Sequence, residues 1–139
     1  MNDYGWQDLA VGLGAAFAVL ITEQMLDDFA RLSGDYNPLH MDPAFAQAAG
    51  FPGRVVFGLL TASFYSRLVG MYLPGKRALL HGVNAEFKNP AQTGDRLTIS
   101  GEISYLNEAY RQIEVKARVV NESGKIISKA TLRAGLHER

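Results

Sequence analysis

The sequence predicts an α+β fold in which one antiparallel β-sheet wraps around a long central α-helix. Residues 58–73, GLLTASFYSRLVGMYL, carry a single charge, which is typical of a helix buried on most of its faces. The segments after residue 78 alternate apolar and polar side chains, as strands with one buried face do. The length of 139 residues suits one domain over 1–139, with a lead-in over 1–14 and a tail over 136–139.

One strand and two helices are predicted before the central helix. Residues 15–21, AAFAVLI, are typical of a strand, and Thr22 is a suitable N-cap for the helix that follows. Gly34 can adopt the left-handed turn that ends this helix. Asp42, followed by proline, is expected to cap a second helix that ends at Gly50. The apolar face of the first helix is expected to hold Met25, Leu26, Phe29 and Leu32.

Strands dominate the second half of the chain. We predict four of them, over residues 78–87, 96–106, 110–120 and 125–136. Asn-Glu-Ser-Gly at 121–124 is a hairpin signal, and 107–109 joins the two middle strands. The buried face of the third predicted strand consists of Ile113, Val115, Ala117 and Val119.

Composition narrows the classes of function. Fourteen basic residues balance fourteen acidic ones and no charge run appears, which argues against nucleic acid and membranes as partners. There is no cysteine, and the N-terminus lacks the features of a signal peptide. We therefore predict a cytoplasmic protein. A sheet around one helix leaves a strand edge and an apolar flank to cover, so we also predict a homodimer or a higher homo-oligomer.

One short stretch, LSGDYNPLHMD over residues 32–42, gathers groups capable of chemistry. Asp35 and His40 flank Asn37-Pro38, whose restricted backbone could aim both side chains at one point. A carboxylate and an imidazole around one water form a general acid–base pair. The plainer interpretation is an Asx turn beside a surface histidine, and on spacing alone both remain open.

Other kinds of site have less support. GLGAAF at 12–17 departs from a dinucleotide-binding loop at Phe17, and no strand precedes it. His81 has no acidic neighbour in the sequence, and His137 lies in the predicted tail. No metal-binding spacing is present, so no metal is expected. A Ser-His-Asp triad stays open, although no serine stands on a signature turn.

Residues 29–70, FARLSGDYNPLHMDPAFAQAAGFPGRVVFGLLTASFYSRLVG, resemble the MaoC-like (R)-specific enoyl-CoA hydratases, which have the hotdog fold. The resemblance rests on the motif at 33–42 and on the helix entry at 56–63. The later FKNPAQTGDRL at 87–97 is also similar to the family, so that the likeness covers about residues 15–135.

This resemblance implies reversible addition of water to an enoyl thioester of coenzyme A or of an acyl carrier protein, without metal or redox cofactor. Asp35 and His40 match the catalytic pair, and we expect Asp35 in apolar surroundings. Asn37 and Ser66 match supporting residues. Ser66 is expected to face the pair from the central helix, or else to bond the carbonyl four residues back.

Gly58 matches the glycine whose backbone N–H meets the thioester carbonyl. This role has independent physical support, because an N–H in the first turn of a helix is a free donor at the positive end of the helix dipole. The plainer interpretation of Gly58 is close packing of the helix.

Phe57 departs from the family pattern, which has histidine at this position. We expect Phe57 to line the substrate pocket and to tune which acyl chain or carrier is accepted. Two other functions remain open for the whole chain: a hotdog acyl-thioester hydrolase, and a non-catalytic subunit of a hetero-oligomeric dehydratase.

Overall fold

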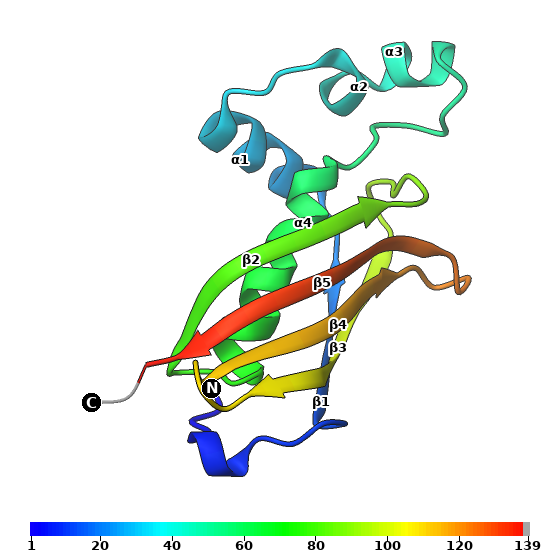
Figure 1. Cartoon of the computed structure of the whole chain (residues 1–139). Helices are drawn as coiled ribbons and strands as arrows, with labels where there is room; N and C mark the ends of the chain where they lie inside the picture. The colour runs from blue at the N-terminus through cyan, green and yellow to red at the C-terminus, as the bar shows by residue number, and fades with distance from the viewer. Residues whose placement is uncertain (138–139) are drawn as a thin grey trace.

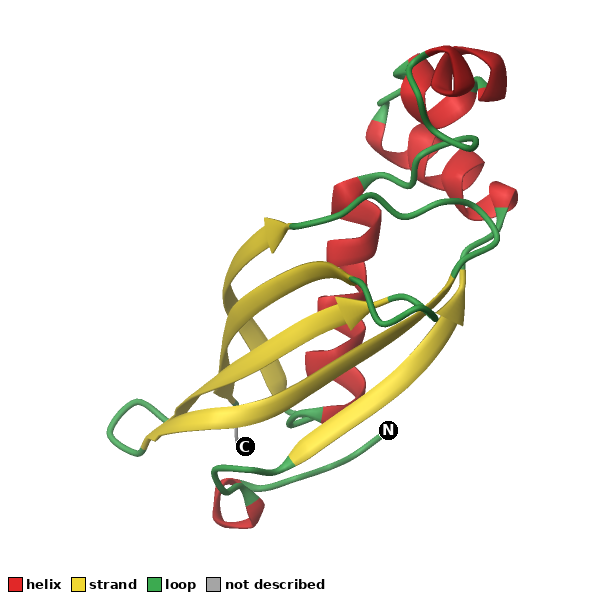
Figure 2. Ribbon diagram, turned by 90° about the vertical axis from the view of Figure 1, so that its right-hand side faces the viewer, coloured by secondary structure: helices red, strands yellow, loops and turns green. Residues whose placement is uncertain are grey.

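A curved antiparallel sheet wraps around one helix in the computed structural model, which describes residues 1–137 (Figures 1 and 2). The sheet has five strands in the order β1-β3-β4-β5-β2. Its members are β1 (Gly14–Leu20), β2 (Ala78–Phe87), β3 (Arg96–Asn107), β4 (Gln112–Val120) and β5 (Ile126–Leu136). The central helix α4 (Gly58–Arg67) continues into a π-helical turn, η2 (Leu68–Tyr72). The predicted α+β architecture is confirmed.

Three short helices lie beyond one end of the sheet, near the start of α4 (Figure 1). They are α1 (Glu23–Ser33), α2 (Pro38–Met41) and α3 (Pro43–Ala48). We call residues 22–53 the overhang and the returning residues 54–57 the strap. Apart from the overhang and strap, the described chain forms the body.

The predicted helix ends in the overhang are confirmed. The Thr22 hydroxyl accepts a hydrogen bond from the Met25 N–H at 3.2 Å, and Gly34 is left-handed with φ 79°. The Asp42 carboxylate accepts from the N–H groups of Ala44 and Phe45, as an N-cap does. These caps form because each depends only on residues close by in the sequence.

Several local expectations are corrected. Leu32 is 85% exposed, because the end of α1 projects past the body and has no surface to pack on. The segment around Asn37 forms a one-turn helix, α2, where only a turn was predicted. Arg111 takes a turn conformation with φ 46°, so β4 begins two residues later than predicted. The His137 N–H bonds the Arg77 carbonyl at 3.0 Å, so the tail does not begin at 136; residues 138–139 lie outside the described part.

The core lies between α4, η2 and the inner face of the sheet. Gly101, Ala117 and Ala130 are in register on neighbouring strands, so that only small side chains cover this part of the inner face. A Cβ on Gly101 would come within 2.6 Å of Leu68 Cδ2, so the small residues let the helix approach the sheet. The predicted buried face of β4 is confirmed, with Ile113, Val115, Ala117 and Val119 all buried.

The lead-in is attached to the body. A short 3₁₀ helix, η1 (Trp6–Asp8), precedes buried Leu9, and Asp3 forms an isolated bridge with Gly75. Within residues 1–137, no helix is both long and apolar enough to cross a membrane.

Candidate active site

His40 occupies the last turn of α2 with its ring held in one orientation. The Asn37 side chain begins the helix by accepting the Leu39 N–H at 3.0 Å. The Nδ1 atom of His40 lies 2.7 Å from the Val55 carbonyl oxygen. Because a carbonyl can only accept, Nδ1 carries the proton, and Nε2 of the neutral ring keeps its lone pair. The bond to the strap therefore leaves Nε2 as the nitrogen of the neutral ring that can accept a proton.

Phe57 supports the His40 ring. The two rings stack with centroids 4.1 Å apart and planes 26° apart, and Phe29 packs against Phe57 at 4.8 Å. Phe57 is 2% exposed and is not among the residues that line the cavity described below. Its side chain packs between the rings of His40 and Phe29 in the overhang. The expected role of Phe57 in selecting the acyl chain or carrier stays a prediction.

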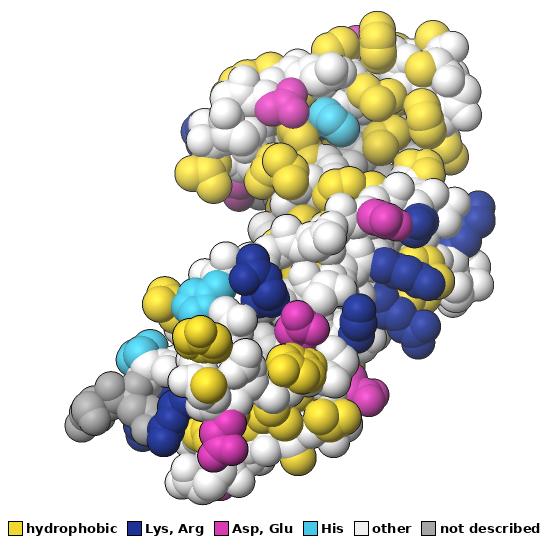
Figure 3. Space-filling view, viewed as in Figure 1, with side chains coloured by type: hydrophobic (Ala, Val, Ile, Leu, Met, Phe, Trp, Pro, Cys, Tyr) yellow, Lys and Arg dark blue, Asp and Glu magenta, His cyan; other side chains and the backbone are white. Residues whose placement is uncertain are grey.

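Asp35 lies on the loop that leads into α2. Its Oδ1 accepts the Asn37 N–H at 3.1 Å, which is an Asx turn, and its own N–H donates to the Ser33 hydroxyl. The side chain is exposed, so the expected apolar surroundings are absent from the described chain. Figure 3 shows a histidine and an acidic side chain exposed on the same face of the overhang. The Asx turn occupies one carboxylate oxygen and is compatible with a reactive role for the other.

A cavity of about 280 Å³ lies between the overhang and the body. His40 forms part of its wall, together with Val55 and Val56 of the strap and Gly58 and Thr61 of α4. The rest of the wall consists of Phe87, the last residue of β2, the following residues 88–91, and Ile127. The cavity thus joins an imidazole to the first turn of a helix.

Gly58 is the first residue of α4 and lines this cavity. The N-cap Phe57 offers no side-chain hydrogen bond, so the positive end of the helix is not neutralised by a side-chain cap. A Cβ on Gly58 would lie 3.3 Å from the Phe87 ring. Gly58 therefore serves close packing and also leaves its backbone open to the cavity, so that both interpretations of this glycine stand.

Ser66 is not brought to His40 by the described chain. It lies eight residues after Gly58 on α4, about two turns away, and is exposed. It is not a wall residue of the cavity. The serine of α4 whose hydroxyl bonds back to the helix is Ser63, which donates to the Leu60 carbonyl at 2.6 Å.

Sequence reasoning missed Arg54. This arginine is only 6% exposed, and its Nε donates to the His40 carbonyl at 2.7 Å. One Nη donates to Asp27 Oδ1 at 2.7 Å. Arg54 directly precedes Val55 and Val56, in the segment that leads into the buried helix. This position was the one indication in the sequence that Arg54 is not an ordinary surface residue.

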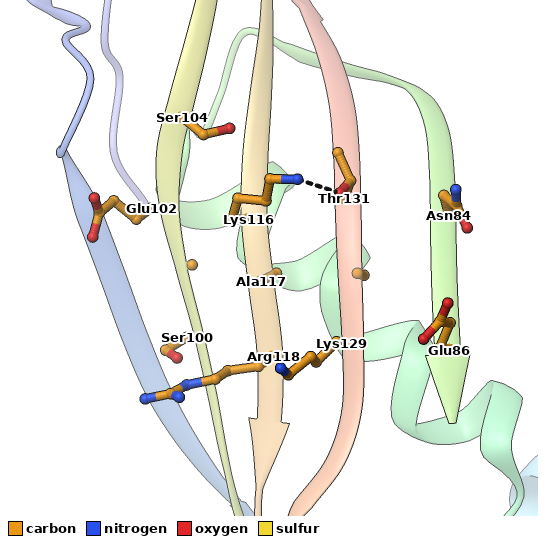
Figure 4. A pocket seen from close by; sticks show the side chains of 12 residues that line it. Asn84, Glu86, Ser100, Glu102, Ser104, Lys116, Ala117, Arg118, Lys129 and Thr131 are labelled. Carbon is orange, nitrogen blue, oxygen red and sulfur yellow. Dashed lines mark hydrogen bonds between the residues drawn. The ribbon is translucent and has the colours of Figure 1, made fainter. Parts of the chain in front are cut away.

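A larger hollow of about 700 Å³ lies on the outer face of the sheet (Figure 4). Its lining is polar, and the Lys116 ammonium donates to the Thr131 hydroxyl at 3.1 Å. The predicted site residues are absent from its wall, and so is His81, whose Nδ1 lies 2.7 Å from Gln112 Nε2. We therefore take the smaller cavity at His40 as the candidate active site.

Comparison with known proteins shows which family the chain resembles. The family described as MaoC like domain matches residues 13–125. The (R)-specific enoyl-CoA hydratase of Aeromonas caviae is 37% identical over 120 residues, which cover 86% of this chain and 90% of that protein. An (R)-specific enoyl-CoA hydratase of Rhodospirillum rubrum is 35% identical over 101 residues, covering 73% and 70%. The solved structure of the A. caviae (R)-hydratase aligns with a TM-score of 0.91 at 34% identity, covering 94% of this chain and 99% of that one.

Proposed function

The chain belongs to the MaoC-like domain family, and on that premise we propose that it is an (R)-specific enoyl-thioester hydratase. The reaction is the reversible addition of water to a trans-2-enoyl thioester, giving an (R)-3-hydroxyacyl thioester. The observation that carries the proposal is the cavity in which the His40 ring, with Nδ1 bonded to Val55, meets the N-terminus of α4.

The chemistry requires a base and a place for negative charge. As the water oxygen bonds to carbon 3, Nε2 of His40 takes a proton from it, and the electron pair of the double bond moves toward the thioester oxygen as an enolate. A proton is then delivered to carbon 2, which returns the acid–base pair to its starting state. Asp35 is the second member of the pair. It orients the water and helps to carry the proton to carbon 2.

Gly58 is proposed to bind the developing enolate. Its N–H lies in the first turn of a helix, where donors have no partner within the helix and the dipole favours negative charge. One such donor typically lowers the barrier by about 3–4 kcal/mol. Because addition of water involves no net oxidation, no redox cofactor is required. We also propose that no metal takes part, since the Gly58 N–H binds the developing charge and the acid–base pair moves the protons; activity should survive treatment with a chelator.

A homodimer is proposed as the working unit. Strand β2 is at one end of the sheet order, so one of its edges has no neighbouring strand among residues 1–137. Its exposed apolar side chains are Leu79, Leu80, Val83 and Phe87. Pairing of two β2 strands would cover both the edge and these side chains. Sedimentation should give twice the 15.2 kDa of one chain, and a monomer at micromolar concentration would contradict the proposal.

The decisive experiment follows the loss of enoyl absorbance with trans-2-enoyl-CoA and enoyl-carrier substrates of several chain lengths. Hydration should proceed without release of free thiol, and chiral analysis of the product should give the R isomer. The matched control is His40→Gln, which keeps a polar side chain but removes the base. Thiol release at the rate of substrate loss would identify a hydrolase instead. Activity that appears only with a second, different chain would identify a subunit of a hetero-oligomer.

A further inference from the structure

We propose that Arg54 is a positioning residue for His40. Arg54 lies outside the cavity and acts on His40 through the backbone of α2. The inference rests on the proposed function in that it takes His40 as the base. Arg54 lines no part of the cavity, so its side chain is not expected to touch the substrate.

The arginine connects three segments. Its backbone belongs to the strap, its Nε donates to the carbonyl of His40, and one Nη donates to Asp27 on α1. The same Nη lies 3.6 Å from the Met41 sulfur. The guanidinium group thus joins the strap to the end of α2 and to the middle of α1.

A buried cation requires compensation. Removal of the guanidinium from water is unfavourable unless its N–H groups find acceptors, and here a carboxylate and a carbonyl supply them. The planar group donates in two fixed directions at once, which one ammonium group on a flexible stem does not reproduce. The site therefore selects arginine by geometry as well as by charge.

The bond to the His40 carbonyl matters because α2 is only four residues long. A helix of this length has little stability of its own, and its last carbonyls have no partners within the helix. The strap supplies the missing contacts. The Val55 N–H donates to the Leu39 carbonyl at 3.1 Å and Arg54 Nε to the His40 carbonyl at 2.7 Å.

These two bonds fix the backbone on which the imidazole depends. The third bond, between His40 Nδ1 and the Val55 carbonyl, sets the tautomer, and it forms only while the backbone of α2 stays in register with the strap. Without Arg54, the carbonyl of His40 loses a charged donor, and the ring is no longer held against Val55. Loss of Arg54 should then reduce the fraction of enzyme whose Nε2 is free to accept a proton.

Two kinds of measurement test this role. Steady-state kinetics on Arg54→Met, Arg54→Lys and Asp27→Asn separates kcat from KM. Nitrogen-15 NMR of the imidazoles reports the tautomer of His40, which is assigned by comparison with His40→Gln. The matched control is Arg31→Met, which removes an exposed arginine that pairs with Asp28 on the same helix as Asp27.

We expect Arg54→Met to lower kcat by about tenfold to a hundredfold, the scale of misplaced catalytic groups. KM should stay within about twofold, because no binding contact is removed. The His40 nitrogen shifts should move toward a mixture of tautomers. Arg54→Lys should recover part of the loss, Asp27→Asn should show a smaller one, and Arg31→Met should match the wild type in all readouts.

Unchanged kcat and unchanged His40 shifts in folded Arg54→Met would overturn the proposal and leave Arg54 as a structural residue. If Arg54→Met does not fold, Arg54→Lys and Asp27→Asn decide in the same way, since each retains a polar group at its position. If the wild type lacks hydratase activity, the proposed function fails, and the NMR comparison still decides whether Arg54 fixes the tautomer of His40.

Discussion

The body and the overhang differ in what holds their side chains in place. In the body, residues such as Ile103, Val115 and Leu132 are fully buried between the sheet and α4. In the overhang, residues 31–38 are all exposed, and α2 depends on hydrogen bonds to the strap. Most of the apolar packing therefore lies in the body, while the candidate chemistry lies in an exposed segment positioned by hydrogen bonds to the strap and by ring contacts with Phe57.

This difference implies that activity and stability can be changed separately. A substitution in the body should lower the free energy of unfolding and leave the turnover of the folded enzyme intact. A substitution of the proposed catalytic groups in the overhang should lower turnover and leave the free energy of unfolding nearly unchanged. The following predictions are ordered from the largest expected effect to the smallest.

The largest effect is expected in the body. Leu132→Ala should lower the free energy of unfolding by about 2–5 kcal/mol, because it leaves a cavity in the core. Urea denaturation checks the stability, and kcat measured at a temperature where the variant is folded should stay near the wild-type value. A large loss of kcat in the folded variant would mean that the body and the overhang are coupled.

The reverse result is expected for the reactive pair. Asp35→Asn and His40→Ala should each lower turnover by at least about a hundredfold, the usual scale for acid–base groups. Circular dichroism should be unchanged for both variants. The urea midpoint should be nearly unchanged for Asp35→Asn, because Asp35 is exposed, and should fall modestly for His40→Ala, which loses the stack on Phe57 and the bond to Val55. A variant that keeps wild-type turnover would show that its residue takes no part in proton transfer.

Tyr65→Phe should affect the body alone. The Tyr65 hydroxyl donates to Ser128 Oγ at 2.8 Å, and both residues are fully buried. Removal of this donor leaves Ser128 without its partner, at a cost of about 1–3 kcal/mol. Thermal or urea unfolding of the two proteins at neutral pH measures the difference.

The same residue gives a pH dependence. Burial raises the pKa of the Tyr65 phenol, and the hydrogen bond with Ser128 opposes that effect. The neutral phenol is therefore favoured in the folded state. Its contribution is fully present below the unfolded pKa of about 10 and is lost as the pH rises above it. The stability difference between wild type and Tyr65→Phe should stay constant up to that pH and shrink beyond it; a constant difference at all pH values would contradict this account.

Phe57→Leu offers a smaller and more selective test. Loss of the ring contacts with His40 and Phe29 should cost about 1 kcal/mol of stability and lower kcat severalfold, since the imidazole loses its support. The matched control in the body is Phe17→Leu, which removes a stacked contact with Tyr72 at 5.4 Å. Equal loss of kcat in both variants would argue that Phe57 has no special relation to His40.

The smallest effect is expected for Asp42→Asn. Asparagine can still accept the N–H bonds of Ala44 and Phe45, so the change should cost about 1 kcal/mol or less. Turnover should stay within about twofold of the wild type, because Asp42 begins α3 and does not line the cavity. A loss comparable with that of Asp35→Asn would place Asp42 among the reactive groups.

The sequence predicted features that depend on near neighbours. The caps at Thr22, Gly34 and Asp42 use groups two to four residues away, and the alternation of β4 follows from its burial on one face. The interpretation of α1 failed at Leu32, because nothing in the local pattern tells where the body ends. The π-helical turn after Arg67, in which Leu68 and Val69 are buried, also has no signature in the local sequence.

For the site, the motif located His40 at the cavity but could not describe its support. The tautomer of His40 is set by Val55, fifteen residues away, and Arg54 acts across twenty-seven residues to Asp27. The place of Phe57 behind the His40 ring depends on how the overhang folds back onto the strap. Such contacts require the folded chain. The place of Ser66 two turns from Gly58, by contrast, follows from helix spacing alone.

The attachment of the overhang has a consequence for the time course of hydrogen exchange. The overhang joins the body at the end of β1 and at the strap, where the Val56 N–H bonds the Ala91 carbonyl at 2.8 Å. Opening at these two places would free α2 and α3 while the pairing of β3 with β4 stays intact. Amides of the overhang should therefore exchange with solvent long before those of the central strands. Occupation of the cavity, which the strap and the body share, should slow the exchange of the overhang far more than that of the sheet.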